Sequence, residues 1–180
     1  MFYLFLADGF EETEALAPLD MMRRAKIEVK TVGVTGEFVT GSHGVTVKAD
    51  LKPEEISFNN IDGVVLPGGM PGTLHLKAHK GLADLLCEFN ENGREIAAIC
   101  AAPTVLGALG LLKEKAACCY PGMEEQLNCK EAKFCSFVTD GNITTSRGVG
   151  TAIPFALELI RQLFGNEKAS EIAESIVYKE

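Results

Sequence analysis

The segment that decides the fold reads Glu95-Ile96-Ala97-Ala98-Ile99-Cys100-Ala101-Ala102-Pro103-Thr104. An apolar run that meets small residues and then a proline predicts a buried strand, a tight turn and a helix start. Proline is favoured in a first helical turn because its missing N–H costs nothing there. Cys100 falls on the turn, at the positive end of the predicted helix dipole, and this position favours the thiolate over the thiol. We therefore treat Cys100 as the candidate nucleophile.

Apolar runs and amphipathic stripes alternate along the rest of the chain. Strands are expected at Phe2–Leu6, Val29–Val34, Val45–Lys48, Gly63–Leu66, Ala116–Cys119, Phe137–Thr139 and Ile143–Ser146. Turn signals predict one hairpin around Thr35-Gly36 and another at Asp140-Gly141-Asn142. Helical stripes follow the Gly63 and Cys100 strands and close the chain. This alternation predicts an α/β layered sandwich with a mainly parallel sheet, and no linker or repeat divides residues 1–180 into more than one domain.

The bulk composition limits the partners of the chain. A net charge of −8 argues against a nucleic acid or an anionic membrane surface as partner. No apolar stretch approaches the roughly 20 residues of a membrane span, and residues 1–7 lack the charged start of a signal peptide. We therefore expect a cytoplasmic protein.

The six cysteines do not indicate a metal or a disulfide framework. Disulfides are not expected in a chain that lacks a signal peptide and can build its own core. Cys118, Cys119, Cys129 and Cys135 match no metal-ligand spacing, so no metal is predicted. Apart from Cys100, we expect the cysteines to be small packing residues that are buried or half-buried.

Three segments should converge at the carboxyl edge of the sheet, because each follows a buried strand. They are Asp8–Glu14, Pro67–Gly69 and Cys100–Ala101. Backbone N–H groups of Gly68, Gly69 and Ala101 would suit an oxyanion hole beside the nucleophile, although paired glycines also occur in plain turns.

Glu11, Glu12 and Glu14 precede or begin a helix, where acidic residues are common for reasons of the helix dipole alone. The residues do not show which carboxyl faces Cys100. A carboxyl beside a thiolate would be driven toward its protonated form and could then donate a hydrogen bond to sulfur.

Four ordered motifs resemble the ThiJ/PfpI family, the superfamily of the parkinsonism-associated protein deglycase and its bacterial relatives. The motifs are Ala7-Asp8-Gly9-Phe10-Glu11-Glu12-Thr13-Glu14, Val65-Leu66-Pro67-Gly68-Gly69, Ala97-Ala98-Ile99-Cys100-Ala101-Ala102-Pro103-Thr104 and Thr145-Ser146-Arg147-Gly148-Val149-Gly150-Thr151. The resemblance implies a flavodoxin-like, class I glutamine-amidotransferase-like three-layer sandwich that is usually a homodimer. It also implies that Cys100 is the reactive cysteine, that Glu14 is hydrogen-bonded to it, and that Gly68, Gly69 and Ala101 are the backbone donors.

The chain departs from the family pattern at the histidine. Many members carry one directly after the cysteine or on a later loop before a proline, where this chain has Ala101 and Tyr120. The three histidines, His43, His75 and His79, all precede Cys100. A Cys–His–Glu arrangement of the peptidase type therefore lacks its base.

Two further residues have both a pocket interpretation and a surface interpretation. His43 lies where relatives often carry a basic residue near the pocket, but a histidine on an exposed loop is more common. Arg24 aligns with an arginine that reaches toward the pocket in some relatives, often across the dimer, or it belongs to a solvated helix face.

Three functions follow as hypotheses. The first is a cofactor-independent enzyme of the glyoxalase or deglycase type, acting on a small carbonyl substrate through Cys100 and Glu14. The second is a redox-sensing chaperone whose Cys100 is oxidised to sulfinate without turnover. The third is a non-catalytic dimeric scaffold. An intracellular peptidase or a thiamine-pathway role, both historically attached to the family, has no support in these residues.

Overall fold

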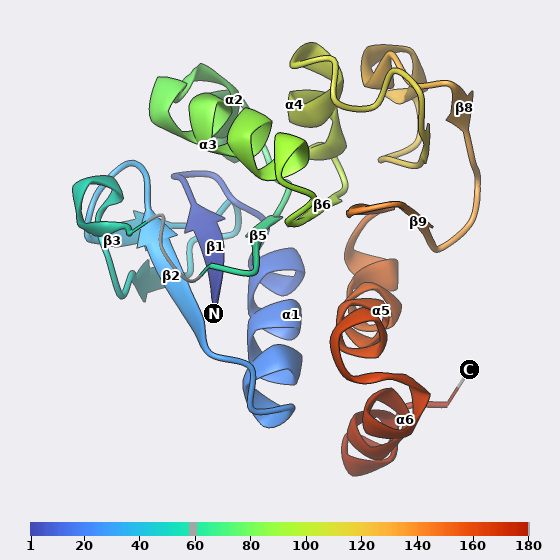
Figure 1. The fold of residues 1–180 in the computed structure, drawn as a ribbon. Coiled ribbons are helices and arrows are strands. Elements are labelled where there is room, and N and C mark those ends of the chain that lie inside the picture. The colour runs from blue at the N-terminus through green and yellow to red at the C-terminus, as the bar shows by residue number, and fades with distance from the viewer. Residues whose placement is uncertain (58–60, 180) are drawn as a thin grey trace.

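A computed structural model describes residues 1–57 and 61–179, in which a six-stranded sheet lies between two layers of helices (Figure 1). In spatial order the strands are β2 (Val29–Gly33), β1 (Phe2–Leu6), β5 (Gly63–Leu66), β6 (Glu95–Ile99), β10 (Ile143–Ser146) and β9 (Phe137–Asp140). All neighbours pair in parallel except β9 and β10, which form an antiparallel hairpin. The predicted α/β sandwich with a mainly parallel sheet is confirmed.

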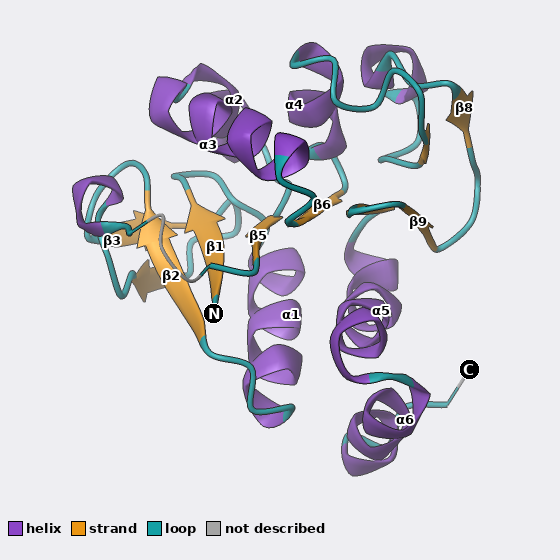
Figure 2. Cartoon of the chain, viewed as in Figure 1, coloured by secondary structure: helices purple, strands orange, loops and turns teal. Residues whose placement is uncertain are grey.

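Helices cover both faces of the sheet (Figures 1 and 2). One layer contains α2 (Gly72–Ala78), α3 (Lys80–Glu91) and α4 (Pro103–Ala108), and the other contains α1 (Glu12–Arg24), α5 (Ala152–Phe164) and α6 (Asn166–Ser175). Strand β1 shows why two layers are needed. Tyr3 and Phe5 pack into one hydrophobic core, whereas Phe2, Leu4 and Leu6 pack into the other. A strand that is apolar on both faces must be covered on both.

Short elements complete the chain. They are β3 (Phe38–Thr40), β4 (Thr46–Lys48), β7 (Ala116–Ala117), β8 (Glu131–Ala132) and the 3-10 turns η1 (Pro53–Glu55), η2 (Glu124–Leu127) and η3 (Val149–Thr151). Strand β3 pairs with β4 in an antiparallel hairpin, and β7 pairs in parallel with β8.

The hairpin predicted around Thr35-Gly36 is wrong. Strand β2 pairs in parallel with β1, and on its other edge Val32 forms a parallel bridge with Leu51, so the chain after β2 does not form an antiparallel hairpin with it. The Thr35 hydroxyl instead accepts a hydrogen bond of 2.9 Å from the Asp8 N–H, which ties this loop to the end of β1. The pairing of β2 is decided by its burial between the two helix layers. Turn residues next to a strand do not predict which strand it pairs with.

The parallel order places the ends of β1, β5 and β6 side by side at one edge. The segments after these strands are the three that carry the glutamates, the glycine pair and Cys100. Their predicted convergence is therefore a property of the fold.

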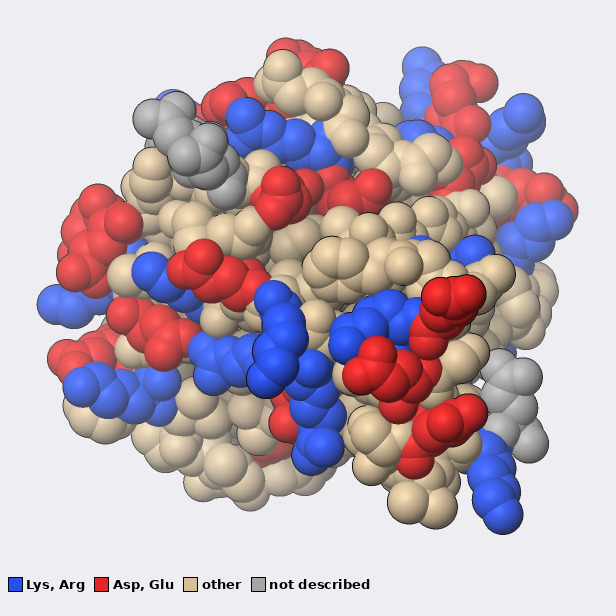
Figure 3. Space-filling view, turned by 60° about the horizontal axis from the view of Figure 1, so that its bottom comes forward, with Lys and Arg blue, Asp and Glu red and all other residues tan. Residues whose placement is uncertain are grey.

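The surface carries charges of both signs. On the face shown in Figure 3, basic side chains lie among acidic ones, although the whole chain has a net charge of −8. Among the helices of the described residues, none is both long enough and apolar enough to cross a membrane.

The packing of α4 yields a stability prediction. A Cβ added at Gly107 would lie 2.3 Å from the Gln126 carbonyl oxygen and 2.5 Å from that of Leu127, both on the backbone. G107A should therefore lower the free energy of unfolding by about 1–3 kcal/mol, although alanine is ordinarily the better helix former by roughly 1 kcal/mol.

The matched control is G81A on the exposed start of α3, where the added Cβ meets only the end of the His79 ring, at 3.3 Å. Urea unfolding of both variants measures the difference. An unchanged or raised stability of G107A would contradict the packing argument.

Candidate active site

Cys100 occupies a strained turn between β6 and α4. Its φ angle is +66°, in the left-handed region that costs a non-glycine residue energy. Two long-range backbone hydrogen bonds hold it there. The Cys100 N–H donates to the Ser146 carbonyl at 3.0 Å, and its own carbonyl accepts from the Tyr120 N–H at 2.8 Å. The strain projects the side chain from the sheet edge, and the half-buried residue remains accessible to a ligand.

Backbone amides surround the Cys100 sulfur. The N–H groups of Gly69 and Ala101 both donate toward it. The Gly68 backbone comes so close that an added Cβ would lie 2.6 Å from the Cys100 Cβ and 2.7 Å from Glu14 Oε2. Only glycine fits at position 68, because the turn that follows β5 passes between the side chains of Cys100 and Glu14.

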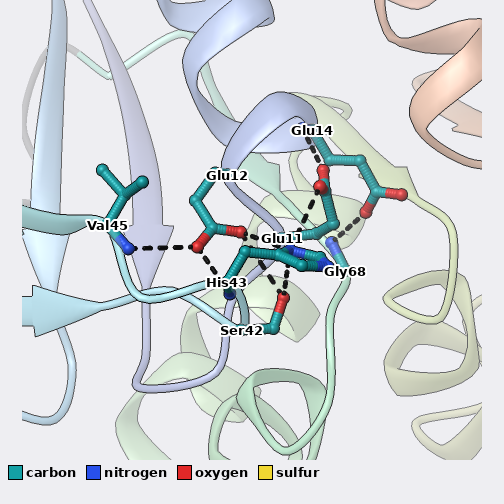
Figure 4. A network of polar contacts seen from close by, with 7 residues as sticks. All are labelled: Glu11, Glu12, Glu14, Ser42, His43, Val45 and Gly68. Carbon is teal, nitrogen blue, oxygen red and sulfur yellow. Dashed lines mark hydrogen bonds and ion pairs between the residues drawn. The ribbon is translucent and has the colours of Figure 1, made fainter.

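Glu14 projects from the first turn of α1 into the same space. Its side chain is nearly fully buried, with 1% exposed. Oε2 accepts the Gly68 N–H at 3.0 Å, whereas Oε1 has no hydrogen-bond partner within the described part of the chain. The Glu14 N–H donates to Glu11 Oε2 at 2.7 Å, so Glu11 caps the helix (Figure 4). Gly68, predicted as an oxyanion donor, therefore donates to Glu14, and Gly69 and Ala101 are the donors that face Cys100.

Glu14 and Cys100 lie within hydrogen-bonding reach of each other and behave as one titrating pair. Burial raises the pKa of Glu14 to about 7. Burial, and then the negative charge of Glu14, raise the pKa of the Cys100 thiol to about 12. The amides of Gly69 and Ala101 act in the opposite direction.

This differs from the expectation that the helix dipole alone holds the thiolate. Helix α4 is only 6 residues long, and burial beside a carboxylate outweighs its dipole. A thiolate forms most easily when Glu14 retains its proton and donates a hydrogen bond to the sulfur. Because the pKa of Glu14 is about 7 and that of Cys100 about 12, the pair exchanges its first proton near neutral pH, and the thiolate form arises when the remaining proton lies on the carboxyl.

An open cavity of about 760 Å³ lies over this pair. Cys100 and Glu14 form part of its wall together with Glu11, Tyr120 and Gly69. Residues 134–136 and 147–151 also line it. A Cβ added at Gly148 would lie 3.7 Å from the Tyr120 ring and 3.8 Å from Glu14 Oε1, so the segment after β10 comes close to the carboxyl.

Three lining residues were missed by sequence reasoning: Phe134, Cys135 and Arg147. Arg147 lies in a motif that the family resemblance had already marked, and it follows β10 as Cys100 follows β6. Cys135 was expected to be buried or half-buried, but it is exposed at the cavity, with its Sγ 3.1 Å from the Phe137 carbonyl. The other four cysteines are buried or half-buried, and all six are free thiols.

Tyr120 lies at the cavity, as its position before Pro121 suggested. Its side chain is about half exposed, and its backbone is tied to Cys100. A phenol therefore stands where many relatives would present an imidazole.

His43 does not line the cavity in this chain. Its ring Nδ1 lies 2.9 Å from Glu12 Oε2, and its backbone N–H donates to Glu12 Oε1 at 2.7 Å. Figure 4 shows Glu12 and Glu14 pointing to opposite sides of the first turn of α1. Burial opposes ionisation of Glu12, but the hydrogen bonds from His43 and its neighbours lower its pKa to about 2. The hydrogen bond and charge of Glu12 raise the pKa of His43.

Ligating atoms of Glu11, Glu12 and His43 come within 4.8 Å of one another, a spacing that a metal ion could use. The ion pair and the backbone N–H donors of residues 43 and 45 already account for this arrangement. It fastens the β3–β4 hairpin to α1.

Arg24 lies at the far end of α1 from Glu14. Ten residues of helix separate them by about 15 Å, and Arg24 pairs with Asp20 at 2.9 Å on an exposed face. Within one chain Arg24 therefore does not reach the cavity, and a role across a dimer stays a prediction.

Comparison with known proteins agrees with this geometry. The sequence model of the DJ-1/PfpI family matches residues 2–162. Drosophila melanogaster protein dj-1beta is 40% identical over 97% of this chain and 95% of its own length. The structure "Toxoplasma gondii DJ-1, oxidized" aligns with a TM-score of 0.94 and 36% identity, covering 99% of this chain and 98% of that one. A Caenorhabditis elegans protein named glutathione-independent glyoxalase DJR-1.2 is 30% identical over 92% of this chain and 89% of its length.

The buried carboxyl yields a prediction on pH and stability. Because the folded-state pKa of Glu14, about 7, lies above its ordinary value of 4.5, ionisation of Glu14 destabilises the fold as the pH rises through this window. E14Q cannot ionise and keeps an oxygen for the Gly68 N–H. Its stability relative to the parent should therefore be higher at pH 8 than at pH 5, by about 2 kcal/mol.

Urea unfolding at both pH values, under reducing conditions, measures this difference. E88Q, which removes an exposed carboxylate from α3, serves as control, and its stability relative to the parent should be nearly the same at pH 5 and pH 8. An E14Q effect that is the same at pH 5 and pH 8 would show that the carboxyl is not destabilised by burial.

Proposed function

Because this chain belongs to the DJ-1/PfpI family, we propose that it is a cysteine-dependent stress-protection protein of the glyoxalase or deglycase type. Its substrates would be small 2-oxoaldehydes such as methylglyoxal, or the corresponding glycation adducts, and no cofactor would be needed. The observation that carries the proposal is the buried Glu14 carboxyl beside Cys100, with a free oxygen and two backbone N–H groups around the sulfur. The name of the Caenorhabditis elegans relative supports it.

The reaction begins with formation of a carbon–sulfur bond. The Cys100 thiolate adds to the aldehyde carbon of methylglyoxal, and the carbonyl π electrons move to oxygen. The N–H groups of Gly69 and Ala101 already point at this region and would stabilise the oxyanion. Glu14, protonated while Cys100 is ionised, supplies the proton that turns the oxyanion into a hemithioacetal hydroxyl.

Proton transfers through Glu14 then oxidise the former aldehyde carbon and reduce the neighbouring ketone carbon. The Glu14 carboxylate removes the hydrogen from the former aldehyde carbon as a proton and passes it to the ketone oxygen, which gives an enediol. Glu14 then takes the proton of the hydroxyl on the first carbon and delivers a proton to the second carbon. The product is a lactoyl thioester of Cys100. Water attacks this thioester, the carbon–sulfur bond breaks, and lactate leaves while the thiol is restored. The first carbon is oxidised and the second reduced, so that no external oxidant or reductant is required.

The pKa of Glu14, about 7, suits both directions of proton transfer near neutral pH. This matters because the chain has no histidine at the cavity among its described residues. One carboxyl must therefore serve as acid and as base.

The direct test follows lactate formation from methylglyoxal. C100S and E14Q should each lose at least about a hundredfold in kcat/KM, since each removes an obligatory bond-making or proton-transferring group. C135S, which alters the other thiol of the cavity, should retain activity within about threefold. A C100S variant as active as the parent would end the proposal.

A second candidate function uses the same pair without turnover. The thiolate of Cys100 would attack a peroxide, taking one oxygen and releasing water, to give a sulfenate, and a second peroxide would give a sulfinate. This redox-sensing chaperone role needs no histidine and draws support from the oxidised state named for the Toxoplasma gondii structure. A protonated Glu14 and the amides of Gly69 and Ala101 would hold the sulfinate oxygens.

Mass spectrometry after mild peroxide treatment tests this candidate. Sulfinate should accumulate at Cys100 several-fold faster than at Cys135, which is more exposed but has no carboxyl partner in the same position. Equal oxidation of the two thiols would count against a built-in sensor. Both versions of the proposal include a homodimer, which the family resemblance implies, and a cytoplasmic location, which the sequence composition suggests.

A further inference from the structure

We propose that Arg147 makes this cavity selective for carbonyl substrates that carry an anionic group, such as a carboxylate or phosphate on a 2-oxoaldehyde. The inference deepens the proposed function and rests on it, since it names the substrate class of the same site. Arg147 would bind the anionic end while Cys100 attacks the aldehyde.

The position of Arg147 is set by the sheet. It follows β10 directly, and β10 is the parallel neighbour of β6, which ends at Cys100. The Arg147 N–H donates to the Thr151 hydroxyl at 3.2 Å, which fixes the start of the side chain. Arg147 and Cys100 both line the cavity, so a ligand that spans it can contact both.

The guanidinium of Arg147 has no carboxylate partner among residues 1–57 and 61–179. It lies 5.8 Å from the centre of the Phe134 ring, a cation–π contact that leaves its N–H donors available. Three of the four other arginines, Arg23, Arg24 and Arg161, are paired with carboxylates. A half-buried arginine left without a counter-ion in a chain of net charge −8 is an unusual arrangement.

The cavity contains one positive charge beside two acidic residues. Glu11 and Glu14 also line the cavity, and Arg147 is its only lysine or arginine among the described lining residues. An anionic substrate is therefore oriented, because its charged end is repelled from the glutamates and attracted to Arg147. The planar guanidinium can bind a carboxylate or a phosphate through two parallel hydrogen bonds.

The spacing limits the size of the ligand. Adjacent parallel strands lie about 4.8 Å apart, and an arginine side chain extends several ångströms further into the cavity. A substrate of three to five carbon atoms, roughly, therefore spans from the sulfur to the guanidinium. A suitable probe is 4,5-dioxopentanoate, a 2-oxoaldehyde with a terminal carboxylate, and methylglyoxal is its neutral counterpart.

The first experiment measures charge selectivity without any turnover. Iodoacetate and iodoacetamide alkylate the same sulfur and have nearly the same shape, but only iodoacetate is an anion. The ratio of their rates at Cys100, followed by mass spectrometry, should fall about tenfold or more in R147Q, in keeping with the loss of a charge-assisted hydrogen bond. R147K should retain part of the ratio, and K113Q, which removes an exposed cation outside the cavity, should leave it unchanged.

The second experiment compares kcat/KM for the two dicarbonyls. R147Q should lose about tenfold or more on 4,5-dioxopentanoate and stay within about threefold of the parent on methylglyoxal. Thermal unfolding of R147Q and R147K verifies that both variants are folded.

The outcomes separate the two proposals. If R147Q lowers the alkylation ratio but neither dicarbonyl is turned over, the anion site stands and the glyoxalase function fails. If methylglyoxal is turned over but R147Q changes neither the alkylation ratio nor the preference between dicarbonyls, the role of Arg147 fails alone. If neither reagent alkylates Cys100, both proposals fail.

Discussion

The structure around the candidate site depends on one constraint: a thiol and a carboxyl are buried against each other and compete for one proton. Neither Cys100 nor Glu14 can ionise without cost, because burial opposes both charges and each anion opposes the other. The fold reduces this cost with three backbone amides. Gly68 serves the carboxylate, while Gly69 and Ala101 serve the sulfur. Side chains larger than hydrogen at Gly68 would separate the pair.

Holding this pair together requires a strained backbone at Cys100 and leaves one carboxyl oxygen of Glu14 without a hydrogen bond in the described structure. Cys100 remains in a left-handed conformation only because Ser146 and Tyr120 hold its N–H and carbonyl from two other segments. Glu14 Oε1 is buried without a partner in the described structure. Such features are unfavourable for stability and are typical of sites in which reactive groups are prepared before a ligand arrives.

The neighbouring acidic residues have separate tasks. Glu11 caps α1, and Glu12 binds the β3–β4 hairpin through His43. This division explains why His43, although it contacts the first turn of α1, is not a partner of Cys100. The ring of His43 is already engaged by Glu12, so Glu14 is left as the titratable partner of the sulfur. Arg147 adds the one positively charged lysine or arginine side chain among the described lining residues of the cavity.

The sequence by itself determined the layered α/β class, the turn at Cys100 and the convergence of three strand ends, because apolar runs, a proline and paired glycines act locally. The turn residues Asp140-Gly141-Asn142 likewise predicted the β9–β10 hairpin. The family resemblance selected Glu14 among three glutamates that local rules do not distinguish. Only the tertiary structure decided that β2 pairs with β1, that Gly68 serves Glu14, and that Phe134, Cys135 and Arg147 face Cys100. These facts depend on which distant segments pack together. The pKa of Cys100 is raised by burial and by the charge of Glu14, and a local sequence pattern reports neither of them.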